Sequence, residues 1–162
     1  MEVSRQYDLF VEKYGSAPAY IDSHLHVHQF PGVREAVMSL AMRGPAESRP
    51  CVRNNGMPLS KIMRQGVSRW KSFFVCFFGR RVRDQLRARG IPTNRGFAGI
   101  YDYREWSRYP EFLDRFVSHM ESETGILAAH PGLEEPWRRV EFEAIRDRLP
   151  AILSRRAESR SP

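Results

Sequence analysis

Residues 21–28 of the chain, Ile-Asp-Ser-His-Leu-His-Val-His, combine a carboxylate with three of the protein's five histidines. Side chains of an extended strand alternate between two faces, so Asp22, His24, His26 and His28 would share one of them. A face this polar is costly to bury unless its nitrogen and oxygen atoms are satisfied. Imidazole and carboxylate groups are ligands of divalent metals, and hydrolysis is a frequent use of such a site. The segment therefore predicts a metal site, although one histidine could instead orient another.

A solvated or purely structural histidine cluster is the alternative interpretation of the same residues. An isolated histidine is usually satisfied by water or by one hydrogen bond and has no ligand. Three histidines at a spacing of two, with an aspartate on the same expected face, favour the functional interpretation.

The composition predicts one soluble domain of modest size. Of the 162 residues, 41% are hydrophobic and 28% are charged, as in ordinary globular proteins. No apolar run approaches the roughly 20 residues that span a bilayer, and residues 1–5 lead into no signal-peptide core. Cys51 and Cys76 are isolated and lack metal-ligand spacing, so we expect reduced thiols. We therefore expect a cytoplasmic protein without a membrane span.

The chain is basic, with a formal net charge of +7 to which arginine contributes most of the positive groups. A basic surface suits nucleic acid, but no zinc-finger, RNP or helix-turn-helix signature accompanies it. We therefore do not expect nucleic acid as a partner.

Hydrophobic periodicity and helix-ending Gly and Pro residues predict alternating helices and strands. The predicted helices cover residues 3–14, 33 to about 44, 68–89, 109–123 and 138–148, and the predicted strands cover residues 19–24, 50–53, 96–100 and 125–129. Residues 57–67 have no clear assignment. The alternation predicts an α/β chain with parallel strands. His24 and His130 each follow or end a predicted strand, at the sheet edge where α/β proteins carry their chemistry.

The predicted helix at residues 68–89 is unusually aromatic, and its C-terminal half is basic. Its large aromatic residues are Trp70, Phe73, Phe74, Phe77 and Phe78. A helix lying on a membrane surface could have this composition. We favour a helix packed into the core, whose arginines are solvated and lie favourably near its C-terminus.

The run from Pro18 to His28, followed by Pro31, resembles the signature of YdjC-like carbohydrate deacetylases. That family includes chitooligosaccharide deacetylases and hopanoid-biosynthesis-associated members. Four further segments resemble the family in order and spacing: Tyr14-Gly15, Val52-Arg53, Gly96-Phe97 to Tyr101-Asp102, and Ala129-His130-Pro131-Gly132. The resemblance covers about residues 3–148. It implies a family domain over residues 1–152, followed by a polar basic tail at residues 153–162.

The family's fold implies part of a distorted (β/α) barrel for this chain. Its reaction implies removal of N-acetyl groups from an amino sugar or oligosaccharide, with a divalent metal, Mg or Zn, that polarises the carbonyl and activates water. By position, His24 matches the family's metal-binding histidine, and His28 is the second candidate ligand. His130 matches a downstream active-site histidine and is the candidate general acid. Asp22 is a candidate supporting carboxylate in catalysis, and Arg53 would hold a carboxylate or a substrate oxygen.

Two segments of the family pattern are absent from this sequence. One is an Asn-Ala-Asp-Asp-Phe-Gly strand that supplies the base and a metal-ligating carboxylate, and the other is a Gly-Leu-His-Leu-Asn-like segment with a further histidine ligand. We therefore expect a C-terminal portion, without the N-terminal strands of the barrel, that holds a metal weakly and has little or no activity. Such a portion would pair with a second copy of itself or with a complementing N-terminal portion.

Two other functions fit part of the pattern. Amidohydrolase-type metal hydrolases also place Asp-x-His-x-His on a strand, but they need later histidines. Here these would be His119, inside a predicted helix, and His130. A degenerate domain without catalysis could instead bind a sugar, a protein partner or RNA through its basic surface. Metal content separates the two hydrolases from this binding domain, and acetate release separates the deacetylase from the amidohydrolase.

Overall fold

The computed structural model describes residues 2–120 and 125–158. The chain divides into two compact units. Unit 1 comprises Met1–Gly56 and Val75–Asn94, and unit 2 comprises Met57–Phe74 and Arg95–Pro162. Both contain helices and short parallel strands, and helix predominates. The predicted α/β class is confirmed at this level.

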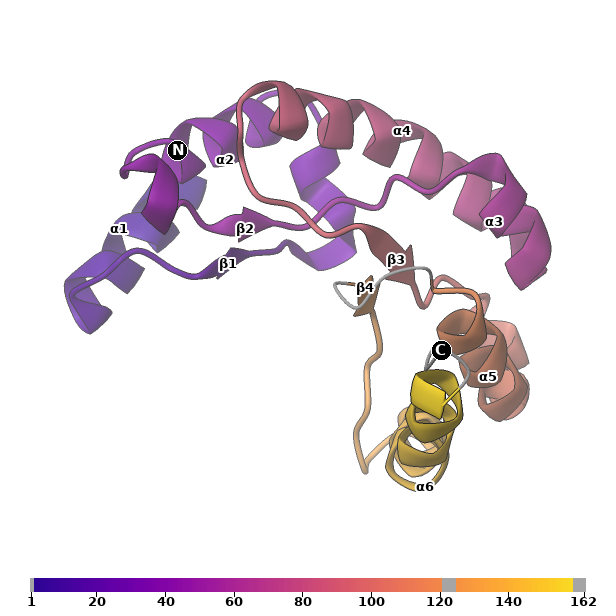
Figure 1. The fold of residues 1–162 in the computed structure, drawn as a ribbon. Helices are drawn as coiled ribbons and strands as arrows, with labels where there is room; N and C mark the ends of the chain where they lie inside the picture. The colour runs from indigo at the N-terminus through magenta and orange to yellow at the C-terminus, as the bar shows by residue number, and fades with distance from the viewer. Residues whose placement is uncertain (1, 121–124, 159–162) are drawn as a thin grey trace. The chain divides into compact units, whose positions relative to one another are not determined.

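Unit 1 is built on the parallel pair of strands β1 (Tyr20–Ile21) and β2 (Cys51–Val52), which lie side by side in Figure 1. Its helices are α1 (Glu2–Tyr14), α2 (Val33–Ala41) and the C-terminal part of α4 (Arg69–Ala88), with a short 3-10 turn η2 (Ala46–Ser48). One face of α2 and one face of α4 pack with β2 into a core. Its buried residues are Val37, Met38, Ala41, Val52, Val82, Leu86 and Ile91.

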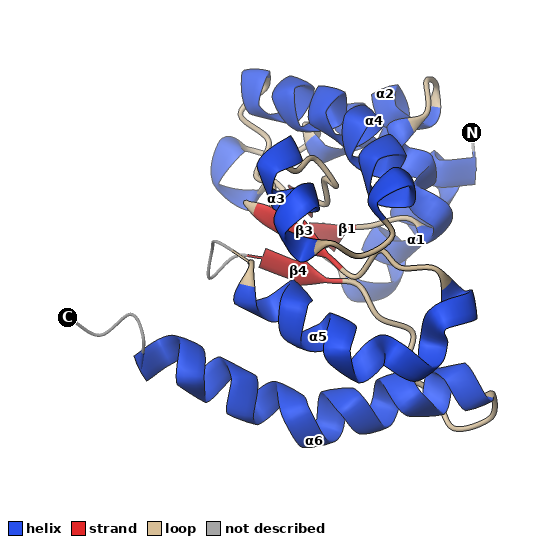
Figure 2. Ribbon diagram, turned by 90° about the vertical axis from the view of Figure 1, so that its right-hand side faces the viewer, coloured by secondary structure: helices blue, strands red, loops and turns tan. Residues whose placement is uncertain are grey.

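Unit 2 contains the parallel strands β3 (Gly96–Ala98) and β4 (Gly125–Leu127). Its helices are α3 (Leu59–Gln65), α5 (Tyr109–Ser118) and α6 (Pro136–Glu158), with a 3-10 segment η3 (Tyr103–Arg108). Helices α5 and α6 pack side by side, as Figure 2 shows. The core between these elements includes Ala98, Tyr109, Leu113, Phe116, Ala144 and Ile152.

The predicted strand at residues 19–24 is shorter in the structure, and the shared histidine face is wrong. Strand β1 ends at Ile21, and η1 (His24–Gln29) follows as 3-10 turns. Within η1, Leu25 and His26 have φ values of 51° and 60°, in the left-handed region. Because the backbone turns instead of staying extended, side chains two residues apart no longer point the same way.

The C-terminal helix is longer than the predicted segment at residues 138–148. Helix α6 begins at Pro136 and continues to Glu158, through Pro150 and into the predicted basic tail. Packing on α5 explains the extension, because Ile152 is buried and Arg156 donates to the Val117 carbonyl at 2.7 Å. The last four residues of the predicted tail, 159–162, lie outside the described residues, as do residues 121–124 at the predicted end of α5.

The aromatic residues of α4 do not enter a core, so the core-packed interpretation is wrong for them. Their exposed fractions range from 39% to 78% for Trp70, Phe73, Phe74, Phe77 and Phe78. The helix is buried instead through smaller residues such as Cys76 and Val82. A Cβ atom on Gly79 would lie 2.6 Å from the Asn55 carbonyl carbon, so only glycine allows this close approach. No helix within the described residues is long and apolar enough to cross a membrane.

Candidate functional site

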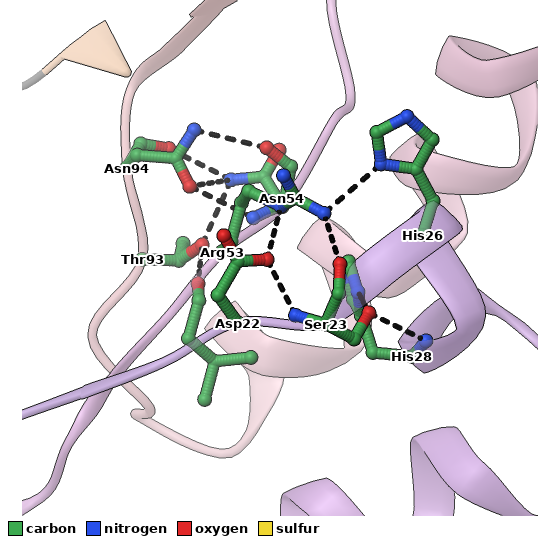
Figure 3. Close-up of polar contacts among 9 residues, drawn as sticks. Asp22, Ser23, His26, His28, Arg53, Asn54, Thr93 and Asn94 are labelled. Atoms are coloured by element: carbon green, nitrogen blue, oxygen red, sulfur yellow. Dashed lines mark hydrogen bonds and ion pairs between the residues drawn. The ribbon is translucent and has the colours of Figure 1, made fainter. Parts of the chain in front are cut away.

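Arg53 is the centre of a polar cluster in unit 1 (Figure 3). It follows β2 directly, and Asp22 follows β1, so the parallel pairing of the two strands brings them together. Arg53 Nε lies 2.7 Å from Asp22 Oδ1. Arg53 Nη2 donates to the Ser23 carbonyl at 2.8 Å and lies 3.0 Å from His26 Nδ1. The Arg53 side chain is only 6% exposed. Its contacts hold the Asp22 carboxylate and the start of the histidine turn.

His28 is buried, with 2% of its surface exposed. Its Nδ1 is hydrogen-bonded to Ser23 Oγ, and its backbone N–H donates to the same oxygen at 3.1 Å. Burial, followed by the positive charge of Arg53 and the neighbouring His26, lowers the pKa of His28 to about 3. The ring is therefore neutral at pH 7. Its Nε2 is buried and has no hydrogen-bond partner among the described residues.

We expect this buried histidine to make the protein less stable in mild acid. The pKa of His28 in the folded chain, about 3, is below its ordinary value of 6.5, so only the unfolded chain takes up this proton between those pH values. Stability therefore falls as the pH decreases through 6.5, by up to about 1.4 kcal/mol per pH unit. Urea unfolding at pH 7 and pH 5 should show a larger loss for the native chain than for His28→Asn. Titrating carboxylates contribute to the loss of stability in both proteins. Equal losses in the native chain and His28→Asn would therefore contradict a buried neutral His28 ring.

Asn54 and Asn94 form a buried amide network that fixes the end of β2. The Asn54 backbone N–H donates to Asn94 Oδ1 at 2.8 Å, and Asn94 Nδ2 donates back to the Asn54 carbonyl at 2.9 Å. Asn54 Nδ2 also donates to Thr93 Oγ1 at 2.8 Å, and Thr93 Oγ1 donates to the Val52 carbonyl at 2.7 Å. Neither asparagine was singled out as a functional residue from the sequence. Two asparagines directly after a buried strand were the available signal, because buried amides need partners.

His130 follows β4 in unit 2 and is held through both its ring and its backbone. Its Nδ1 lies 3.2 Å from the Tyr103 hydroxyl. Its backbone N–H donates to Glu141 Oε2 at 2.5 Å, and its carbonyl accepts from Arg138 Nε at 3.1 Å. The other Glu141 oxygen accepts from the Tyr101 hydroxyl at 2.5 Å, and Glu141 is completely buried. The candidate acid is therefore held by contacts with Tyr103, Glu141 and Arg138.

The sequence reasoning missed Tyr103 and Glu141. Glu141 had a usable signal: it lies three residues before the buried Ala144, so a carboxyl group falls on the apolar side of a helix. A carboxyl group in that position needs donors, which indicates a structural or functional polar contact. Tyr103 had no comparable signal, because its position depends on the 3-10 segment η3.

The predicted metal ligands do not assemble into a complete site. His24 is exposed, Asp22 is paired with Arg53, and His28 is buried with Nδ1 bonded to Ser23. Among residues 2–120 and 125–158, no group of three or more His, Cys, Asp or Glu side chains could hold a metal ion. The described residues alone therefore do not fit the metal that the family resemblance implies. His24 belongs to unit 1 and His130 to unit 2, so a site shared by both stays a prediction.

Comparison with known proteins gives matches over most of the chain. The sequence profile of the family described as YdjC-like protein matches residues 1–159. Chitooligosaccharide deacetylases of Salmonella paratyphi C and Salmonella typhimurium are each 29% identical over 122 residues, which cover 72% of this chain and 44% of each relative. The chitooligosaccharide deacetylase of Escherichia fergusonii is 46% identical over 41 residues, 25% of this chain and 16% of the relative. The chain spans less than half the length of these relatives, and no solved structure matches.

Proposed function

Because the chain belongs to the YdjC-like protein family, we propose that it is part of a carbohydrate deacetylase-like hydrolase that removes N-acetyl groups from amino sugars. Similarity to chitooligosaccharide deacetylases over 72% of the chain supports this substrate class. The observation that carries the proposal is His130, held at the end of β4 by Tyr103 and Glu141. We also assign the two units to part of a distorted (β/α) barrel, in a cytoplasmic protein. Acetate release from N-acetylated chitooligosaccharides, and not from unrelated N-acyl amides, is the test against an amidohydrolase.

The residues of this chain supply part of the chemistry that amide hydrolysis requires. Water adds to the acetyl carbonyl, and the amine nitrogen must take up a proton as the C–N bond breaks. His130 is the proposed donor of that proton. Asp22, paired with Arg53, is the proposed supporting carboxylate. Arg53 is the proposed contact for a substrate oxygen when its ion pair with Asp22 opens.

We infer that this chain is weakly active or inactive when alone. Its sequence contains no Asp-Asp-Phe-Gly segment, which the family resemblance assigns to the base. Its described residues bring no three metal ligands together. A second copy or a complementing N-terminal portion is the proposed partner. The exposed aromatic side chains of α4, 78% exposed at Trp70, are a surface that such a partner would cover.

We expect weak binding of a divalent metal that depends on His24. An exposed imidazole can ligate a metal, but with few neighbouring ligands it holds the ion loosely. Calorimetry with zinc, magnesium and cobalt should give weaker binding for His24→Ala than for the native chain. His119→Ala, which changes a histidine outside the 21–28 segment, is the matched control and should bind as the native chain does. Equal binding by the native chain and His24→Ala would remove His24 from the metal site.

A further inference from the structure

The half-buried ring of His130 contacts two aromatic side chains of unit 2. It lies edge-on to Tyr103, with the ring centroids 5.8 Å apart, and tilted against Trp137 at 6.1 Å. The Tyr103 ring itself is in contact with Trp137 at 5.0 Å and with Tyr101 at 4.9 Å. These contacts leave the imidazole few orientations.

Hydrogen bonds also fix the backbone of His130. Its N–H donates to the buried Glu141 carboxyl group, and its carbonyl accepts from Arg138 Nε. With both backbone groups bonded, the remaining freedom of His130 is rotation of its side chain. The contact that controls this rotation is the one between Nδ1 and the Tyr103 hydroxyl, at 3.2 Å.

The Tyr103 hydroxyl is suited to act as the donor in that contact. Partial burial, followed by the nearby Glu141 carboxyl group, raises the pKa of Tyr103, so its hydroxyl keeps the proton at neutral pH. Lys71 Nζ lies 4.8 Å from the centroid of the Tyr103 ring, and its positive charge strengthens a phenolic donor. A phenol is a stronger donor than a neutral imidazole N–H, and an imidazole nitrogen is a stronger acceptor than a phenolic oxygen. These preferences favour a neutral pair in which the hydroxyl donates to Nδ1 and the ring proton is on Nε2.

We propose that Tyr103 is a positioning residue that occupies Nδ1 of His130 and leaves Nε2 as the nitrogen that gives its proton to the leaving amine. This rests on the proposed role of His130 as general acid. A hydroxyl both donates and accepts, so the contact persists when the ring is charged: Nδ1–H then donates to the Tyr103 oxygen. As the C–N bond breaks, the Nε2 proton passes to the amine nitrogen. The ring becomes neutral with its remaining proton on Nδ1, still bonded to Tyr103, and uptake of one proton from water at Nε2 restores the charged acid.

The test measures which nitrogen of His130 carries the proton, by ¹⁵N NMR at about pH 8.5, above the ordinary titration range of histidine. The chain has five histidines, so His130→Gln identifies the signals of this ring. The native chain should be mainly in the Nε2–H form. Tyr103→Phe keeps the ring contacts and removes only the hydroxyl, so the ratio of the Nε2–H to the Nδ1–H form should fall about two- to tenfold, the effect of one neutral hydrogen bond. Trp137→Phe keeps the hydroxyl and should leave the ratio unchanged.

An unchanged ratio in Tyr103→Phe, or a native chain mainly in the Nδ1–H form, would overturn the proposal. Thermal unfolding of each variant checks that the fold is retained, and Tyr103 is 40% exposed, so the loss of its hydroxyl should be tolerated. This result and the acetate assay are independent. A shifted ratio without acetate release would remove the deacetylase reaction but not the hydrogen bond, whereas acetate release with an unchanged ratio would remove only the role of Tyr103.

Discussion

Replacing Glu141 with alanine is expected to lower the free energy of unfolding by roughly 3–5 kcal/mol. Glu141 is completely buried and accepts hydrogen bonds from the Tyr101 hydroxyl and the His130 backbone N–H, each at 2.5 Å. Alanine leaves both donors without this partner, at about 1–3 kcal/mol each, and adds a cavity. Urea unfolding of the native chain and the variant measures the loss.

Two further variants separate the buried carboxyl group from general effects on helix α6. Glu141→Gln keeps the shape and one acceptor oxygen, so it should lose less stability than Glu141→Ala. Glu143→Ala removes an exposed carboxylate from the same helix and should stay within about 0.5 kcal/mol of the native chain. A Glu141→Ala protein as stable as Glu143→Ala would show that the two hydrogen bonds do not support the His130 segment.

Helices could be predicted from the sequence where hydrophobic periodicity and flanking Gly or Pro residues indicate the same helix ends. The segment at residues 3–14 became α1, and the glycine and proline before Val33 mark the start of α2. The histidine turn was not predictable from these patterns. It depends on Ser23, whose hydroxyl bonds to both the ring and the backbone N–H of His28. Side-chain to backbone bonds of this kind compete with the extended conformation and leave no trace in hydrophobic periodicity.

The aromatic stripe of α4 shows a second limit of sequence patterns. Helical spacing places Trp70, Phe74 and Phe77 along one side of a helix, but it does not say whether that side or the opposite one is buried. The close approach of Gly79 to Asn55 determines which side is buried, because the α4 backbone can come this near to Asn55 only on the side that carries the glycine. That contact joins residues far apart in sequence.

The candidate site was predictable to the extent that motifs marked strand ends. His130 follows the parallel strand β4, as the sequence indicated, whereas Arg53 lay within the predicted strand at residues 50–53 and follows β2 in the structure. The partners that hold them were harder to predict, since Asp22 pairs with Arg53 across 31 positions and Tyr103 reaches His130 across 27. These pairings depend on how distant segments come together in the fold. The residues next to either partner in the sequence do not indicate this.

The measurement that tests the central claim most directly is acetate release from N-acetylated chitooligosaccharides by the purified chain with zinc, magnesium or cobalt in excess. Under the proposed function His130 is the acid of a sugar deacetylase, whereas the sequence lacks the family's base segment and the described residues bring no three metal ligands together. General base catalysis alone contributes about 10²–10⁴-fold, so release should be at least about a hundredfold below an ordinary turnover of ~1–10 s⁻¹. Any residual release should fall further in His130→Ala. Turnover on the order of 1 s⁻¹ by the chain alone, or residual release unchanged in His130→Ala, would contradict the account.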